Sequence, residues 1–312
     1  MDLMALDVDV VEVVLTPNWA FAPLAADVAD WLTEDHGADA RGRRRPEAII
    51  IITETSISGR GDHDASTMWR ELGTSLLDVL YPPVCAGCDI SLRHGRSLCD
   101  ACDTNLPRLD APFCQCCAEA FDGRVDTAAT CPRCLEEEPT YDFARPVLRR
   151  SDQGLELIHR FKYLREIHLA GELGRIAAEA FTDPRLIEAR RDGWPIVPVP
   201  LHRSRQRQRH FNQASEIARI LSRQLQLPTV PALKRIRATG SQTKLTREQR
   251  RKNLKGAFAL TRRGRRWLEE KAELGVVLVD DVLTTGATVE ECARVLRKAG
   301  FEQVIVVAVM RG

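Results

Sequence analysis

Apolar residues form runs and periodic stretches in the C-terminal half of the chain. Residues 276–279 are a continuous apolar run, as expected of a strand buried on both faces of a parallel sheet. Residues 196–201 form a second apolar run, which is interrupted and ended by prolines. Helical spacing of apolar residues covers residues 211–225, and another helix is predicted over residues 288–299, closed by Gly300. This succession of strands and helices predicts an α/β domain with a parallel sheet.

The N-terminal part carries weaker signals. Residues 8–15 have the pattern of a strand, whereas residues 56–66 are polar and typical of a flexible loop. A helical pattern begins at Met68. We therefore divide the chain into an N-terminal extension (residues 1–67), a cysteine-rich module (68–140) and a C-terminal domain (141–312). Two interpretations of the extension stay open: a disordered segment, or residues upstream of a translation start at Met68.

Length and composition narrow the class of protein. The 312 residues are 44% hydrophobic, which excludes a wholly disordered chain and allows about two domains with cores of their own. No apolar run approaches the roughly 18 residues that a membrane-spanning helix needs. The acidic N-terminus has no basic segment before an apolar one, so no signal peptide is predicted. We expect a cytoplasmic protein.

The net charge of +1 conceals a strong asymmetry between the two halves. Residues 1–150 carry 14 basic and 26 acidic side chains, and residues 151–312 carry 31 basic and 18 acidic. Within the basic half, residues 202–266 hold 19 Lys and Arg against only Glu216 and Glu248. This distribution indicates that the C-terminal domain binds an anion.

Nine of the ten cysteines lie within residues 85–134. Eight of them form four C-x2-C pairs, the spacing with which two thiolates reach one tetrahedral ion. The predicted zinc ligands are Cys85, Cys88, Cys99, Cys102, Cys114, Cys117, Cys131 and Cys134. Cys116 is extra, and Cys292 lies in a helical pattern as a buried small residue.

The ligand pairs can combine in two ways. Sequential pairing joins the first pair with the second and the third with the fourth, and interleaved pairing is the alternative. We favour sequential pairing because the intervening loops are short. Closure by four thiolates leaves no position for water, so one or two structural Zn²⁺ ions are predicted. A disulfide framework is the competing interpretation, which the absence of any secretion signal disfavours.

A second chemical signal follows the apolar run of residues 276–279. Asp280 and Asp281 come at its carboxyl end, where open α/β sheets place ligands. A small-residue loop and a predicted helix follow, and their N–H groups make an anion site. Paired carboxylates beside such a site can accept hydrogen bonds from the vicinal hydroxyls of a ribose.

This stretch resembles the fingerprint of the type I phosphoribosyltransferases over residues 276–288. The resemblance implies a Rossmann-like parallel sheet flanked by helices, and phosphoribosyl pyrophosphate with Mg²⁺ as ligand. It implies that Asp280 and Asp281 contact the ribose hydroxyls. It also implies that the 5′-phosphate is cradled by Thr284, Thr285, Gly286, Ala287 and Thr288.

Further blocks sharpen the resemblance. They comprise Pro82-Pro83-Val84 before the first C-x2-C pair, Phe161-Lys162-Tyr163, Val197-Pro198-Val199-Pro200-Leu201, Phe211-Asn212-Gln213, and Arg237, Thr239, Gln242 and Leu245. Over about residues 68–312 the chain resembles the ComF family of competence and DNA-uptake proteins, which join a zinc-ribbon module to a type I phosphoribosyltransferase domain. One departure is His210, where the family usually has glycine.

The resemblance makes Asp280, Asp281 and Lys162 the candidate catalytic residues, with Lys162 as a pyrophosphate contact. The alternating arginines could close over the pyrophosphate or bind a nucleic-acid backbone; they are Arg203, Arg205, Arg207 and Arg209. Because alternate residues do not share one helical face, we expect a mobile loop there.

Two functions stay open from the sequence. The first is a phosphoribosyltransferase, or a binder of phosphoribosyl pyrophosphate, that acts in DNA uptake or utilisation. The second is a non-catalytic single-stranded-DNA-binding protein of natural transformation that reuses the fold as a scaffold. Aromatic residues are sparse in residues 202–266, which favours contact with the DNA backbone over base stacking.

Overall fold

The computed structural model describes residues 83–92, 95–121, 123, 129–238, 247–270 and 275–312. The predicted strand at residues 8–15 and the helical pattern from Met68 lie outside the described residues, as do Thr239, Gln242 and Leu245. Among the described helices, none is long and apolar enough to cross a membrane.

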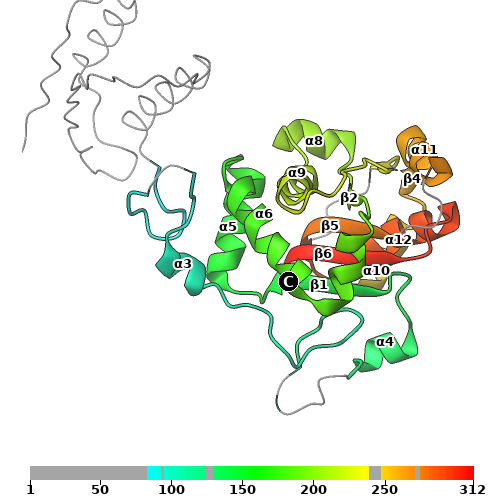
Figure 1. Cartoon of the computed structure of the whole chain (residues 1–312), viewed down its shortest axis with the longest axis horizontal. Coiled ribbons are helices and arrows are strands. Elements are labelled where there is room, and N and C mark those ends of the chain that lie inside the picture. The colour runs from blue at the N-terminus through cyan, green and yellow to red at the C-terminus, as the bar shows by residue number, and fades with distance from the viewer. Residues whose placement is uncertain (1–82, 93–94, 122, 124–128, 239–246, 271–274) are drawn as a thin grey trace, which may run out of the picture. The chain divides into compact units, whose positions relative to one another are not determined.

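A four-stranded parallel sheet forms the centre of the C-terminal domain (Figure 1). Its order is β1-β6-β5-β2, and every neighbouring pair is parallel. The strands are β1 (Phe143–Leu148), β2 (Ile196–Pro198), β5 (Val276–Leu283) and β6 (Val304–Arg311). The predicted parallel α/β sheet is confirmed.

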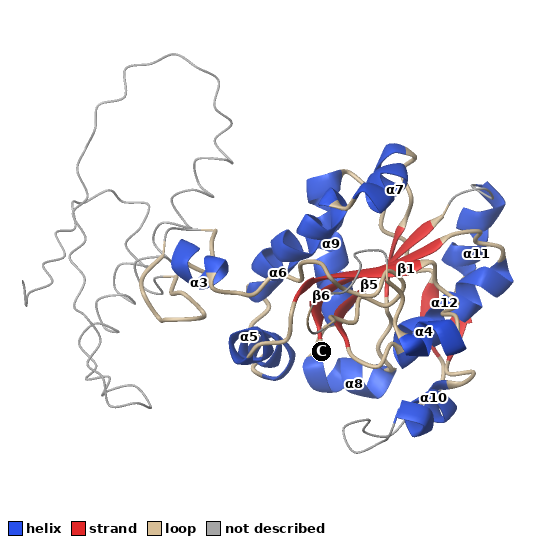
Figure 2. Ribbon diagram, turned by 90° about the horizontal axis from the view of Figure 1, so that it is seen from below, coloured by secondary structure: helices blue, strands red, loops and turns tan. Residues whose placement is uncertain are grey.

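Helices cover both faces of this sheet. Figure 2 shows α6 and α9 on one side and α12 on the other. The longer helices are α5 (Asp152–Tyr163), α6 (Leu169–Ala178), α9 (Gln213–Leu225) and α12 (Ala287–Ala299). Shorter ones are α3 (Asp100–Thr104), α4 (Pro132–Glu136), α7 (Ile187–Arg191), α8 (Arg203–Arg209), α10 (Arg247–Leu254) and α11 (Arg262–Glu270), with 3-10 turns at Glu179–Thr182 and Pro184–Leu186.

The burial of β5 explains why its sequence is continuously apolar. Val277 and Val279 belong to the core on the side of α6 and α9. Val276 and Leu278 belong to the core on the side of α12. Because successive side chains point to opposite faces, a strand covered on both sides needs an apolar residue at every position.

A small antiparallel sheet lies beside α12. It pairs β3 (Leu233–Arg235) with β4 (Phe258–Leu260). Helix α10 lies between these two strands along the chain. Gly256 N, just before β4, donates a hydrogen bond of 2.7 Å to Glu291 of α12.

Strand β5 is longer than the apolar run predicts, since it continues through both aspartates to Leu283. The extension pairs with β6, where Asp280 lies opposite Ala308 and Leu283 opposite Arg311. On its other side β2 ends at Pro198, opposite Val279. The aspartates therefore lie just past the end of β2, at an opening on that side of the sheet.

Candidate functional site

A cavity of about 640 Å³ opens where β2 and β5 end. Its walls come from α5, the segment after β2, the start of α9, β3 and the end of β5. The lining side chains that carry charge are Asp152, Glu156, Lys162, Arg205, Arg209, Arg235, Asp280 and Asp281. Thr284 and Thr288, at the two ends of the loop after β5, line the same cavity. The cavity therefore unites the aspartates, the ends of the loop and part of the arginine run.

Lys162 pairs with one of the two aspartates. Its Nζ lies 2.8 Å from Asp281 Oδ1, and both side chains are largely buried. Asp280 Oδ1 accepts a hydrogen bond of 2.9 Å from the N–H of Asp281. Burial, and next the charge of Asp281, raise the pKa of Asp280 well above its usual range, although Lys162 acts in the opposite direction. Lys162 thus lies at the carboxylate pair and neutralises part of its charge.

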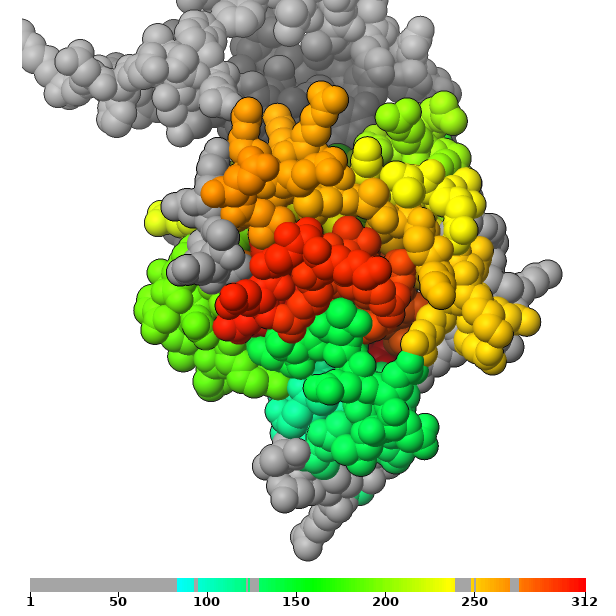
Figure 3. Space-filling model, turned by 90° about the vertical axis from the view of Figure 1, so that its right-hand side faces the viewer, coloured from blue at the N-terminus to red at the C-terminus, as the bar shows by residue number. Residues whose placement is uncertain are grey.

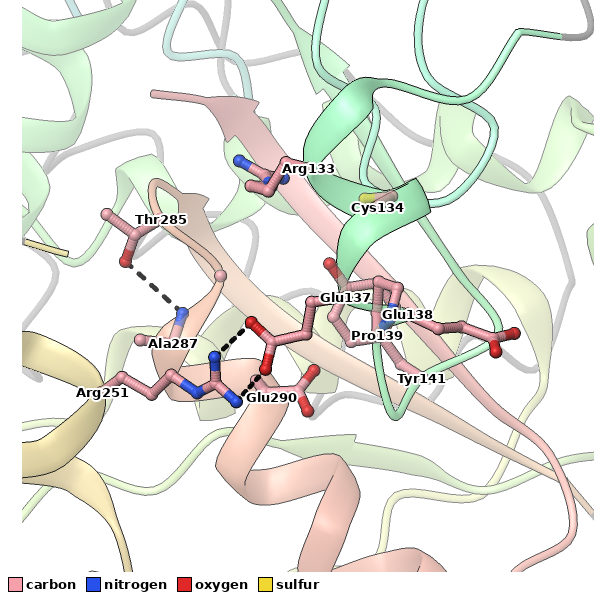
Figure 4. Close-up of a pocket in the computed structure, with 11 residues that line it drawn as sticks. Arg133, Cys134, Glu137, Glu138, Pro139, Tyr141, Arg251, Thr285, Ala287 and Glu290 are labelled. Atoms are coloured by element: carbon pink, nitrogen blue, oxygen red, sulfur yellow. Dashed lines mark hydrogen bonds and ion pairs between the residues drawn. The ribbon is translucent and has the colours of Figure 1, made fainter. Parts of the chain in front are cut away.

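The loop after β5 has two sides. Thr284 and Thr288 line the main cavity, whereas Thr285, Gly286 and Ala287 line a smaller one of about 50 Å³. Gly286 has φ of 80°, a backbone conformation that favours glycine, and directly precedes α12. Ala287 N donates to Thr285 Oγ1 at 3.4 Å (Figure 4). Of the five predicted cradle residues, the structure thus places two at the main cavity and three at the smaller one, and Thr288 brings the first turn of α12 to the main cavity.

The predicted mobile loop at the arginine run was wrong, because residues 203–209 form helix α8. The His202 side chain caps this helix by accepting a hydrogen bond from Ser204 N at 3.2 Å. On a helix, positions four apart share a face, so the alternation yields two pairs on opposite faces. Arg205 and Arg209 line the cavity, whereas Arg203 and Arg207 are exposed and are not among its lining residues. A surface helix can direct each pair to a different environment.

Helix α8 ends at His210, whose φ of 69° is left-handed. Glycine adopts this conformation without a steric cost, and histidine is one of the side chains that tolerate it. The departure from the family pattern at His210 therefore falls on a helix-terminating turn.

Arg209 connects three elements across the cavity. Its guanidinium lies 5.0 Å from the centre of the Tyr163 ring, and its Nη2 donates to the Tyr163 hydroxyl at 3.3 Å. Its Nη1 donates to Gln213 Oε1 at 3.1 Å. One side chain of α8 thus contacts the end of α5 and the start of α9.

Arg235 and Gln213 were not among the predicted site residues, although both line the cavity. Arg235 is 8% exposed and stacks on Phe258, with 5.3 Å between its guanidinium carbon and the ring centre. In β3, Leu233 and Arg235 are buried while Lys234 is exposed. This two-residue alternation was the available signal, because it places an arginine on the inward face of a strand.

The cysteines gather into two tetrads by sequential pairing, so the favoured pairing is confirmed. One tetrad is Cys85, Cys88, Cys99 and Cys102, and the other is Cys114, Cys117, Cys131 and Cys134. In each, all sulfurs lie within 4.8 Å of one another. Tetrahedral Zn²⁺ with bonds of about 2.3 Å requires sulfurs about 3.8 Å apart. The Sγ atoms of Cys88 and Cys99 are 3.7 Å apart, and so are those of Cys117 and Cys131. Both sets fit zinc, and none of these cysteines is in a disulfide.

Backbone N–H groups stabilise the thiolates that such sites need. Cys85 Sγ accepts from Cys99 N at 3.3 Å and from Gly87 N at 3.4 Å. Burial raises the pKa of Cys85, but these donors outweigh it and lower the pKa to about 6. Cys114 Sγ likewise accepts from Cys131 N at 3.3 Å. There too backbone donors outweigh burial and lower the pKa to about 7. Cys292, which lies outside both tetrads, is fully buried in α12, as predicted.

The second tetrad lies next to the loop after β5. Arg133, Cys134 and Glu137 line the smaller cavity together with the loop. Figure 4 shows Arg251 of α10 paired with Glu137, which directly follows α4. Figure 3 shows the end of the cysteine-rich module (green) packed against the C-terminal part of the chain (red). Thr140 N donates to Glu290 of α12 at 3.0 Å.

The first tetrad contacts the opposite wall. Arg160 of α5 donates to the carbonyl of Ala86, between the first two cysteines. Glu172 of α6 is buried and accepts from Ser97 N at 3.4 Å. The two cysteine sites therefore support different walls of the cavity: α5 with Lys162, and the loop with α12.

Comparison with known proteins agrees with this arrangement. A model of the double zinc ribbon domain matches residues 76–135, and a model of the phosphoribosyl transferase domain matches residues 212–312. Competence protein F of Haemophilus influenzae is 32% identical over 222 residues, 70% of this chain and 93% of its own length. The chain belongs to the ComF family.

Other members of the ComF family match as well. DNA utilization protein YhgH of Escherichia coli K12 is 32% identical over 227 residues, 71% of this chain and 94% of its own length. Competence protein ComFC of Bacillus subtilis is 24% identical over 221 residues, 67% of this chain and 81% of its own length. The fold is thus a type I phosphoribosyltransferase domain preceded by a double zinc ribbon, as the sequence predicts.

Proposed function

We propose that this ComF-family protein binds phosphoribosyl pyrophosphate with Mg²⁺ in the main cavity and acts in DNA uptake or utilisation. The observation that carries the proposal is the carboxylate pair at the end of β5 beside the N-terminus of α12. Asp280 and Asp281 can accept hydrogen bonds from vicinal ribose hydroxyls, while the loop N–H groups receive the 5′-phosphate. The names of the relatives from H. influenzae and E. coli support the cellular role.

The same cavity is suited to phosphoribosyl transfer. In that reaction the bond from C1 to the diphosphate breaks, its electron pair leaves with the diphosphate, and an acceptor atom bonds to C1. The chain contributes orientation of the ribose by the aspartates and positive charge near the leaving diphosphate from Arg205 and Arg209. Mg²⁺ bound with the ligand supplies further neutralisation. Lys162 fixes the position of Asp281.

The test is a calorimetric titration with Mg-phosphoribosyl pyrophosphate. Asp280→Asn combined with Asp281→Asn keeps the side-chain volumes but removes both charges, so binding is expected to be abolished. Unchanged affinity in the double variant would refute the site. A screen for pyrophosphate release with a panel of bases and amines then separates an enzyme from a binder, since a binder releases none.

A second candidate function is sequence-tolerant binding of single-stranded DNA. The observation that favours it is the exposed pair Arg203 and Arg207, which faces away from the cavity lining. Helix α11 adds exposed arginines at positions 262, 263, 265 and 266. Contacts to phosphates weaken as salt rises. A fluorescence titration at low and high salt tests this function, and absence of binding at low salt would exclude it.

A further inference from the structure

The start of helix α9 forms part of the cavity wall. Asn212, Gln213 and Ala214 all line it. The first N–H groups that bond within this turn are those of Ser215 and Glu216, which donate to Asn212 O at 3.0 and 3.1 Å. The N–H groups of Gln213 and Ala214 therefore have no acceptor inside the helix, and the positive end of its dipole lies at the cavity.

Asn212 does not cap this helix. Its Nδ2 instead donates to Val199 O at 3.0 Å, which ties the start of α9 to the segment after β2. A side chain that would usually satisfy an N-terminal donor is thus used to fix the wall. The helix terminus stays available to a ligand.

The side-chain amide of Gln213 supplies an independent observation. The residue is only 1% exposed, and its Oε1 accepts from Arg209. Among the described residues, none accepts a hydrogen bond from its buried Nε2. A buried donor that is left unpaired destabilises the folded chain. A polar group retained at that cost on a cavity wall indicates that a ligand atom with a lone pair completes it.

The surrounding charges specify what kind of atom this is. Arg205, Arg209 and Arg235 line the same cavity. Burial, and then the positive charge of Arg205, lower the pKa of Arg235. Cations crowded in this way are stabilised by an anion, and several guanidinium groups with a helix N-terminus suit one that carries more than one charge.

We propose that Gln213, together with Arg235, completes a diphosphate subsite in which Gln213 Nε2 donates a hydrogen bond to a diphosphate oxygen. The loop before α12 already provides a separate place for the 5′-phosphate, so the second anion site matches the other end of the ligand. This assignment rests on the proposed function, since it takes the cavity to hold phosphoribosyl pyrophosphate. It gives Gln213 a role in distinguishing a diphosphate from ligands that lack one.

The experiment uses the full zinc-loaded chain and two probes, magnesium pyrophosphate and ribose 5-phosphate, in calorimetric titrations. Gln213→Leu removes the donor with little change in volume. A hydrogen bond to a charged oxygen predicts a loss of about 10- to 100-fold in pyrophosphate affinity. The affinity for ribose 5-phosphate should stay within about twofold. Gln206→Leu on α8, exposed and outside the cavity lining, is the matched control and should change neither.

Other outcomes overturn the assignment. Equal losses for both probes indicate that Gln213 only holds the fold, and no loss for pyrophosphate shows that its amide does not contact the diphosphate. Gln213→Glu gives a second variant, whose added charge can still pair with Arg209 but should abolish pyrophosphate binding. If the wild-type chain binds neither probe, the proposed function and this assignment both fail. The Gln213 assignment alone fails if Asp280→Asn with Asp281→Asn abolishes the affinity for ribose 5-phosphate while Gln213→Leu leaves the affinity for pyrophosphate unchanged.

Discussion

Replacing Lys162 by methionine should destabilise the folded chain, and the loss should grow with pH. Methionine keeps the length of the side chain but leaves Asp281 without the cation whose Nζ lies 2.8 Å from its Oδ1. At that distance and an effective permittivity of 20, the pair attraction is about 6 kcal/mol before desolvation is subtracted. Removing one partner of a buried pair costs about 3–5 kcal/mol. We expect the free energy of unfolding to fall by about 3 kcal/mol at pH 8.

The pH dependence follows from the raised pKa of Asp280. A carboxyl whose pKa is higher in the folded than in the unfolded chain contributes stability below its unfolded pKa. That contribution is lost as pH rises through the folded pKa. Lys162 lowers the pKa of Asp280 in the folded chain, so its removal raises that pKa further. The loss of stability then continues to a higher pH than in the wild-type chain and becomes larger in total. The deficit of the variant should therefore be smaller at pH 5.5, where a proton replaces the missing cation.

Urea unfolding followed by circular dichroism at pH 5.5, 7 and 8, in buffer that contains zinc, measures this deficit. Lys234→Met, at an exposed position of β3, is the matched control and should cost under about 0.5 kcal/mol at every pH. Asp281→Asn added to Lys162→Met should recover most of the loss, because it removes the uncompensated charge. A deficit that is independent of pH, or one no larger than the control, would refute the role of the ion pair.

Three further predictions concern the zinc sites and α8. A chelator should remove zinc in two phases. The faster phase should come from the tetrad with the exposed Cys88, because the other tetrad is fully buried. A single phase would contradict this prediction, and Cys88→Ser should eliminate only the fast phase. Gly87→Ala should accelerate that phase further, since its Cβ would lie 2.7 Å from Cys102 Sγ, whereas Gly171→Ala, with open space around it, should not. His210→Gly should raise the free energy of unfolding by about 0.5–1 kcal/mol in urea titrations by relieving the left-handed backbone; an unchanged or lower value would show that the histidine makes a compensating contact.

Much of this protein is encoded in short stretches of sequence. The C-x2-C spacing predicts the metal ligands, since two thiolates on one turn reach one ion. The continuous apolar run in β5 predicts a doubly covered strand, and the residues after it predict an anion site. Each of these features depends on neighbours along the chain. Sequence alone therefore determined the fold class and the zinc ligands, and it predicts an anion site at the loop after β5.

The composition of the cavity wall was decided only by the tertiary structure. Lys162 and Asp281 are far apart in the chain and meet because α5 packs near the end of β5. The alternation of the arginines predicted a loop, yet a surface helix sends Arg205 and Arg209 inward and their neighbours outward. Charge pairing and burial depend on which elements pack together, and periodicity along one element does not contain that information.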